Sequence, residues 1–230
     1  MKTHVAISIT ELRFWIRHLY AFLCLFIFSC VAFADDNYQK GIQAYGGGQH
    51  EEAVDWFRKS AEAGYDEGQY LYGLLYERGQ IVEQDYRAAT EWYRKAANQG
   101  HAKAQFNLGL MYDKGEGVPQ DDQLAVKWWR RAAEQGLVDA QYNLGYMYKK
   151  GLGGPQDDQL AVRWWRRAAE QGLVDAQYNL GTMSFNGNGV PKNYQLAAYW
   201  YRRAAEQGEA LAQYNLGVMY AEGLGVPKDY

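Results

Sequence analysis

Cysteine, serine and histidine are scarce in this 230-residue chain, and their scarcity excludes most catalytic chemistry. Both cysteines, Cys24 and Cys30, lie before Asp35, so the rest of the chain has no thiol for a disulfide or a nucleophile. Beyond that point the only serines and histidines are Ser60, Ser184, His50 and His101. No metalloprotease, P-loop, nucleophile-elbow or dithiol motif occurs. We therefore predict no catalytic residue, no cofactor and no metal site.

Basic residues are outnumbered, which argues against a nucleic-acid partner. The chain has 24 Lys and Arg against 27 Asp and Glu, a formal net charge of −3. Three of the basic residues, Lys2, Arg13 and Arg17, lie before Asp35, so the remainder is more acidic still. Because proteins that bind nucleic acid carry basic patches or stripes, we predict no nucleic-acid partner.

The N-terminal segment, residues 1–34, has the three parts of a secretion signal. A basic start precedes an apolar core at residues 19–28, and a small-x-small sequence ends at Ala34. The apolar run is too short to span a membrane comfortably. We predict that residues 1–34 are a signal peptide cleaved near Ala34, and that the protein is periplasmic or secreted.

One cysteine leaves a second possibility open. The sequence from Ile27 to Cys30 is similar to a lipoprotein processing site, in which the cysteine is acylated and becomes the first residue. Phe28 is bulky for such a site, so cleavage after Ala34 is the favoured interpretation. We expect membrane contact only if the chain is lipid-anchored at Cys30.

From Glu67 onward the chain repeats one sequence with small changes. The step is 36 residues, and glycines, glutamines and tryptophans keep it. The glycines are Gly73, Gly109, Gly145, Gly181 and Gly217. The glutamines are Gln69, Gln105, Gln141, Gln177 and Gln213. The tryptophans are Trp56, Trp92, Trp128, Trp164 and Trp200. A fixed period of about 20 to 50 residues indicates a solenoid of stacked supersecondary units.

Each unit carries the signals of two helices joined by a short link. A helix is predicted over residues 102–114, because Gly115 suits the left-handed residue that ends a helix. Pro119 stops the link from becoming helical, and Asp121 can cap the second helix, which runs to about Gln135. Its broad apolar stripe consists of Leu124, Ala125, Trp128, Trp129, Ala132 and Ala133. The predicted fold class is all-α, an α/α superhelix of helix-turn-helix repeats with a 36-residue period.

The two ends of the array differ from its middle. Residues 35–64 form a shorter unit with a triple-glycine turn, which we interpret as a short tetratricopeptide-like N-terminal repeat that caps the array. Residues 65–230 form the full array, and its last repeat is incomplete. We expect either a truncated sequence or another subunit docked beyond Tyr230, where a second helix would begin.

The repeated units resemble the Sel-like repeat (SLR) family, a relative of the tetratricopeptide repeat. The shared motif begins A-x-A-Q-[YF]-N-L-G-x-M-Y-x-x-G-x-G-V-P, and the resemblance covers residues 67–230. It implies an α/α superhelix that acts as an adaptor or regulator, with roles in envelope signalling or host interaction for exported bacterial members. Some cysteine-rich relatives have been described as β-lactamase-like, but their disulfide pattern is absent here.

The resemblance also implies a concave groove lined by the first helix of each repeat. At one offset from the glycine, the aromatic residues are Tyr70, Phe106, Tyr142, Tyr178 and Tyr214. Beside them lie Asn107, Asn143, Asn179 and Asn215, with Lys114 and Lys150 near the rim. Exposed aromatic rings are good anchors for a peptide, and amide groups can pair with its backbone. We predict that these residues bind a peptide.

Each set also has a purely structural interpretation. The rings could pack between neighbouring first helices, and the asparagines could tether the backbone of an adjacent repeat. The paired arginines after the tryptophans read as a solvated outer face, with Glu134 and Glu170 as partners.

We therefore expect an exported, non-catalytic scaffold that binds a protein or peptide in its concave groove. Its role would be that of an envelope adaptor, a regulator or a host-interaction factor. Two alternatives remain open: a binder of peptidoglycan or of a cell-wall enzyme that uses the aromatic rings for sugar stacking, and a residual β-lactamase-like hydrolase.

Overall fold

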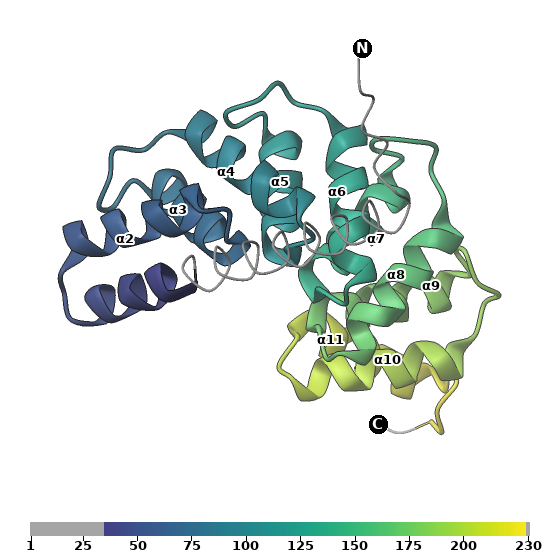
Figure 1. Cartoon of the computed structure of the whole chain (residues 1–230). Coiled ribbons are helices and arrows are strands. Elements are labelled where there is room, and N and C mark those ends of the chain that lie inside the picture. The colour runs from purple at the N-terminus through teal and green to yellow at the C-terminus, as the bar shows by residue number, and fades with distance from the viewer. Residues whose placement is uncertain (1–34, 229–230) are drawn as a thin grey trace, which may run out of the picture. The chain divides into compact units, whose positions relative to one another are not determined.

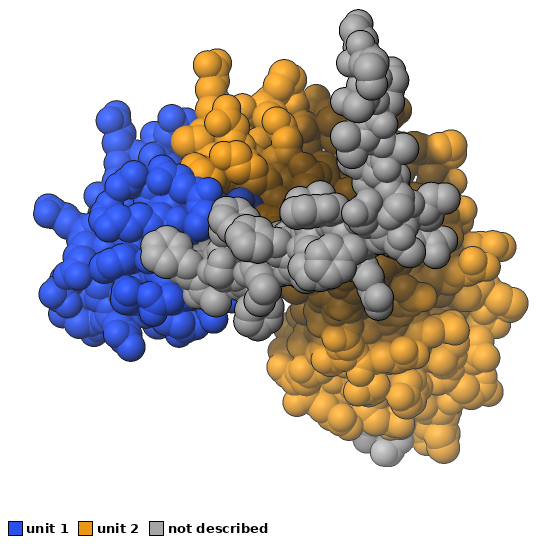
Figure 2. Space-filling model, viewed as in Figure 1, with its two compact units in different colours: residues 1–85 blue, residues 86–230 orange. Residues whose placement is uncertain are grey.

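The computed structural model describes residues 35–228. The predicted signal peptide, the alternative anchor at Cys30 and the terminal Tyr230 lie outside the described residues. Within them, all regular secondary structure is helical. The chain forms two compact units, residues 1–85 and residues 86–230, which are described separately below (Figure 2).

Residues 35–46 are helical, and ten further helices follow within the described residues (Figure 1). Unit 1 contains α2 (His50–Glu62) and α3 (Asp66–Arg78). Unit 2 contains α4 (Tyr86–Asn98), α5 (Ala102–Lys114), α6 (Asp122–Glu134), α7 (Val138–Lys150), α8 (Asp158–Glu170), α9 (Val174–Asn186), α10 (Tyr194–Glu206) and α11 (Ala210–Glu222). The odd-numbered helices are the first of each repeat and are called A helices here; the even-numbered ones are B helices. The predicted all-α repeat fold with a 36-residue period is confirmed.

The predicted helix boundaries of the clearest repeat are also confirmed. Helix α5 ends at Gly115, whose φ of 72° is left-handed and whose N–H donates to the Met111 carbonyl oxygen. Asp121 caps α6, because its carboxylate accepts a hydrogen bond of 2.9 Å from the Leu124 N–H. Both signals act within one turn of the chain, which is why the sequence alone locates them.

Within a repeat, the two helices meet where a glycine faces an aromatic ring. A Cβ added to Gly109 on α5 would lie 2.5 Å from the Trp129 ring on α6, so no larger residue fits there without a shift. The Trp129 indole N–H donates to the Phe106 carbonyl oxygen at 3.1 Å, and its side chain is 2 % exposed. Most of the apolar stripe predicted for this helix, including Trp129, is buried in the structure.

Successive repeats of unit 2 share one continuous set of contacts. Ala132 and Ala133 of α6 belong to the same apolar cluster as Ala140 and Leu144 of α7. The link of each repeat then reaches back to the preceding B helix: a Cβ on Gly117 would lie 2.1 Å from the Tyr86 carbonyl oxygen. Each repeat therefore stabilises its neighbour, as expected for a solenoid.

Candidate binding surface

Three of the predicted aromatic residues of unit 2 pack on the second aromatic residue in the B helix of their own repeat. Ring centroids are 6.4 Å apart for Phe106 and Trp129, and 6.4 Å apart for Tyr142 and Trp165. The rings of Tyr178 and Tyr201 are 5.8 Å apart. The first ring of each pair is half-buried, so part of it still reaches the surface. We call Phe106, Tyr142, Tyr178 and Tyr214 the aromatic ladder.

Tyr214 differs from the rest of the aromatic ladder, and Tyr70 belongs to unit 1. Tyr214 lies on α11 and is 69 % exposed, the most exposed large apolar side chain in residues 35–228. Tyr70 is half-buried, and burial raises the pKa of its phenol, with a further rise from Glu77. The structural interpretation of the rings is therefore partly correct, because they pack on helix B as well as facing outward. Their role in peptide binding stays a prediction.

The four asparagines lie beside these rings and are half-buried. Burial raises the pKa of the Tyr142 phenol, Asp175 adds to the rise, and a hydrogen bond with the Asn179 side chain opposes it. Burial also raises the pKa of Tyr201, which has hydrogen bonds with Thr182 and Asn215. Asn179 and Asn215 thus lie within reach of phenol groups of the preceding repeat. Asn107 and Asn143 occupy the same position in their own helices.

The two predicted lysines are exposed at the ends of their helices, as expected for a rim. Lys114 forms a long ion pair of 3.9 Å with Glu116 in the following link. The Lys150 ammonium lies 5.9 Å from the centre of the Tyr146 ring. Both contacts are weak in water, so either lysine can exchange its partner for a ligand carboxylate.

Glutamines tether the backbones of neighbouring repeats, and this role was missed from the sequence. The buried Gln141 donates to the Ala133 carbonyl oxygen at 3.1 Å and accepts from Gln171 at 2.8 Å. Gln171 also donates to the Gly136 carbonyl oxygen at 3.2 Å. The bonds to an alanine carbonyl and between two glutamines recur through Gln105 with Gln135 and through Gln177 with Gln207. Gln207 also donates to the Gly172 carbonyl oxygen at 3.2 Å. These six residues form a glutamine ladder through unit 2, and its signal was the 36-residue step of glutamine itself.

Arginines of the B helices donate to tyrosines 18 residues later, on the following A helix. The pairs are Arg94 with Tyr112, Arg130 with Tyr148, and Arg202 with Tyr220. The fourth pair is missing, because Ser184 occupies the tyrosine position and is buried. Arg166 consequently has no hydrogen bond or ion pair within residues 35–228.

The sequence predicts Glu134 and Glu170 as partners of the arginine pairs, Arg130 with Arg131 and Arg166 with Arg167. This prediction was wrong, because none of these arginines forms an ion pair with either glutamate within residues 35–228. Arg131 lies over the Trp128 ring, and Arg167 lies over the Trp164 ring, each 4.7 Å from the ring centre. A guanidinium stacks well on an aromatic face, and its apolar stem covers the ring from water. An arginine of the same helix thus covers one face of the first tryptophan, while the preceding repeat also contacts it, since Trp164 packs against the apolar cluster of α6 and α7.

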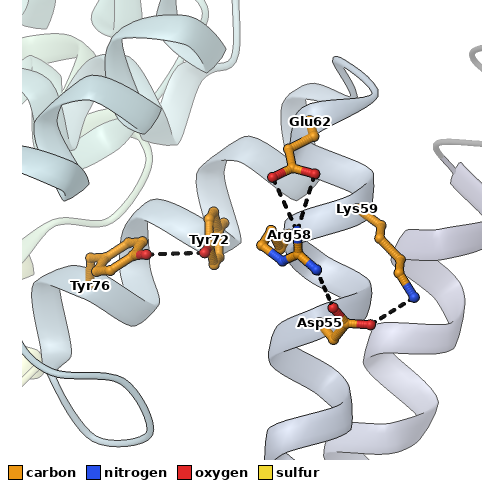
Figure 3. A network of polar contacts seen from close by, with 6 residues as sticks. All are labelled: Asp55, Arg58, Lys59, Glu62, Tyr72 and Tyr76. Carbon is orange, nitrogen blue, oxygen red and sulfur yellow. Dashed lines mark hydrogen bonds and ion pairs between the residues drawn. The ribbon is translucent and has the colours of Figure 1, made fainter.

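In unit 1 the arginine at the repeat position of Arg94 and Arg130 is Arg58, and acidic residues of its own helix bind it (Figure 3). It pairs with Asp55 and Glu62, while Asp55 also pairs with Lys59 at 2.7 Å. Hydrogen bonds from Lys59 and Arg58 hold the pKa of Asp55 below its usual value. All four side chains are exposed, so the network contributes little stability.

The tyrosine that would meet Arg58 has another partner. Tyr76 shares a hydrogen bond of 3.0 Å with Tyr72 one turn earlier on α3, and the two rings are in edge contact (Figure 3). Tyr72 occupies the position that Leu108 has in the next repeat. Burial, together with this hydrogen bond, raises the pKa of Tyr72 well above its usual value.

Two cavities lie at equivalent places in the repeat, one in each unit. Each is lined by the second aromatic residue of a B helix, which is Phe57 in unit 1 and Tyr201 in unit 2. The cavity of unit 2 has a volume of about 230 Å³ and brings together Tyr178 and Asn215, two of the predicted site residues. Thr182 also lines it, with its hydroxyl 3.1 Å from that of Tyr201. This cavity therefore offers both an aromatic ring and polar groups.

Residues 35–228 contain neither a metal-binding cluster nor a membrane-spanning helix. No three His, Cys, Asp or Glu side chains of this part of the chain gather closely enough to hold a metal ion. None of its helices has the length and apolar character needed to cross a bilayer.

The helices and their 36-residue period define a helical repeat solenoid. The pattern of the Sel1 repeat family matches residues 34–65, 66–101, 102–137, 138–173, 174–209 and 210–230. The chain belongs to the Sel1 repeat family, whose members generally mediate protein–protein interaction and generally act as non-catalytic scaffolds. The first match coincides with the unit that we interpreted as a shorter tetratricopeptide-like repeat.

Solved structures of the same family are similar to this chain. One is c5321, a protective antigen present in uropathogenic Escherichia coli strains, with 42% identity and a TM-score of 0.81 over 86% of this chain. This chain spans only 43% of the length of c5321. Another is a Sel1 repeat protein from Oxalobacter formigenes, with 40% identity and a TM-score of 0.79, covering 84% of this chain and 79% of that one. No curated protein matched the chain.

Proposed function

We propose that this protein is an exported, non-catalytic scaffold that binds a peptide segment of a partner protein on the A-helix face of unit 2. One observation carries the proposal: the aromatic ladder recurs every 36 residues, its rings reach the surface, and one of its members opens into a cavity of about 230 Å³. Rings already fixed by packing on helix B lose little entropy when a ligand covers them.

The polar groups beside the rings suit an extended peptide. Asn215 and the Thr182 hydroxyl line the same cavity as Tyr178, so an apolar side chain and a backbone amide can be bound side by side. The exposed Lys114 and Lys150 lie at helix ends and suit acidic residues of the ligand. Export rests on the basic and apolar sequence of residues 1–34.

Peptide binding is tested by changing Tyr142 and Tyr178 together to alanine and passing an envelope extract over the immobilised protein. The wild type is expected to retain a partner that the double variant loses. Tyr199→Ala is the matched control, because Tyr199 is a 48 % exposed tyrosine on a B helix. A partner retained equally by all three proteins would contradict the proposal, provided that circular dichroism shows the double variant folded.

Export is tested separately by fractionating cells that produce the full chain. We expect the protein in the periplasm or the medium, with Asp35 as its first residue by N-terminal sequencing. An intact N-terminus in the cytoplasm would contradict export, and an acylated Cys30 would replace secretion by a lipid anchor.

A further inference from the structure

A second cavity lies in unit 1, outside every residue assigned above. Its volume is about 200 Å³, and its walls come from the helical residues 35–46, from α2, and from α3 with the link that follows it. The lining includes Ile42, Tyr45, Phe57, Leu71, Leu74 and Arg78. Ile42 and Tyr45 are 43 % and 45 % exposed, so the cavity is reached from the surface.

Changes in the repeat explain why this cavity exists and why it is apolar. Phe57 occupies the position of Trp129 and Trp165, so the ring beside the cavity is smaller than the indole of those repeats. Leu71 occupies the position at which later repeats have Asn179 and Asn215. The equivalent cavity of unit 2 is polar because it has an asparagine at this position, whereas that of unit 1 has a leucine.

One charged group stands at the edge of this apolar cavity. Arg78 is the last residue of α3 and is exposed. It has no hydrogen bond or ion pair within residues 35–228, whereas the arginine of the preceding helix, Arg58, is held by Asp55 and Glu62. An unpaired guanidinium beside an apolar hollow is complementary to a carboxylate that adjoins an apolar side chain.

We propose that the cavity of unit 1 binds one large apolar side chain of a peptide, and that Arg78 binds the carboxylate of the adjacent acidic residue. The volume suits one such side chain, because a cavity of about 150 Å³ lined by similar residues holds a benzene ring. The proposal shares with the proposed function only the premise that the ligand is a peptide, since the two sites have no residue in common.

The test is a random peptide library displayed on phage and selected against the full chain. We expect enrichment of a leucine, methionine or phenylalanine next to an aspartate or glutamate. Enriched peptides are then synthesised, and their affinity is measured by fluorescence anisotropy for the wild type and for Leu71→Asn, Arg78→Gln and Phe57→Trp.

Each variant isolates one part of the site. Leu71→Asn installs the residue of the later repeats and is expected to weaken binding at least tenfold. Phe57→Trp installs the larger ring of Trp129 and is expected to weaken it similarly while the protein stays folded. Arg78→Gln is expected to remove only the preference for an acidic neighbour, so that a peptide with asparagine there binds as well as one with aspartate.

Four results would overturn the proposal. The first is selection of peptides without an apolar–acidic pair. The second is equal affinity of the selected peptides for the wild type and for Leu71→Asn. The third is a dimer in solution that Leu71→Asn dissociates, since a second copy would then occupy the cavity. Peptides that lose affinity for the Tyr142→Ala, Tyr178→Ala double variant but not for Leu71→Asn would also reject this site, while leaving the proposed function intact.

Discussion

The Trp165 indole N–H donates to the Tyr142 carbonyl oxygen at 3.1 Å, and the same ring lies on Gly145 of the same helix. This contact joins α7 to α8: α7 supplies the carbonyl acceptor and a glycine without a side chain, and α8 supplies the indole ring. It also supports the ring of Tyr142, which belongs to the aromatic ladder. The surface proposed to bind a peptide therefore depends on the packing directly beneath it.

Gly145→Ala tests this contact. A Cβ at residue 145 would lie 2.5 Å from the Trp165 ring, so we expect a loss of about 1–3 kcal/mol from overpacking. Gly217→Ala is the matched control, since its Cβ would meet nothing within 4 Å. There the better helix propensity of alanine is expected to add about 0.5–1 kcal/mol. Urea unfolding midpoints measure both changes, and equal shifts would contradict the packing described here.

Gln141→Met tests the glutamine ladder. Methionine keeps the length of the side chain but removes the bonds to the Ala133 carbonyl oxygen and from Gln171. Because that carbonyl lies in the core, we expect a loss of about 1–3 kcal/mol in the free energy of unfolding. Gln213→Met removes the same kind of bond to Ala205, but Gln213 is exposed, so we expect a loss of less than about 0.5 kcal/mol. Similar losses at the two sites would show that burial does not set the cost.

Ser184→Tyr is expected to restore the missing arginine–tyrosine pair by giving Arg166 a phenol partner on the following A helix. The new phenol can accept from Arg166 as Tyr148 accepts from Arg130, with a gain of about 1 kcal/mol in unfolding free energy. A double-mutant cycle with Arg166→Met measures the coupling between the two side chains. We expect the gain to vanish in the Arg166→Met background, and a gain that persists there would assign it to burial of the ring alone.

Asp113→Asn is expected to stabilise the protein at neutral pH. Burial raises the pKa of Asp113, Asp122 raises it further, and Lys114 opposes them. A carboxyl group whose pKa is higher when folded binds its proton more tightly in the folded state, so its contribution to stability falls as pH rises through the unfolded pKa towards the folded one.

The stabilisation by asparagine should therefore depend on pH. Because Asp113 is partly exposed and solvent screens its charge, we expect a gain of about 0.5 kcal/mol at pH 7. The gain should be absent below the pKa of an unfolded aspartate, where the carboxyl is protonated in both states. Urea unfolding at pH 7 and pH 3 measures this difference, and a gain of the same size at both values would exclude the carboxylate as its cause.

Several features of the fold could be predicted because their causes are local. Gly115 ends α5 and Asp121 begins α6 through hydrogen bonds within one turn, and both positions were predicted from the residue types alone. The core role of Trp129 followed from the helical spacing of its apolar neighbours, and the structure confirms it. Where one helix could be read by itself, the sequence was sufficient.

The candidate site was less predictable because its properties depend on residues that meet only after folding. Asparagine and glutamine carry the same amide group. On the sequence, Asn143 was the candidate for a tether to the backbone of an adjacent repeat, but in the structure Gln141 makes that bond. Glu134 was expected to be the partner of Arg130 and Arg131, but Arg130 donates to Tyr148 and Arg131 lies on the Trp128 ring. In each case the sequence allowed two different interactions, and the packing of the folded helices decided which one formed.

The sequence by itself determined the helices, their ends and their 36-residue repetition, because capping and apolar periodicity act over a few residues of one chain. The tertiary structure alone decided how much of each repeated side chain reaches the surface. Trp128 is 8 % exposed, whereas Trp164, at the same position of its repeat, is half-buried. It also decided that Phe57 and Leu71 line an apolar cavity, since a hollow is formed by residues of several helices and belongs to none of them alone.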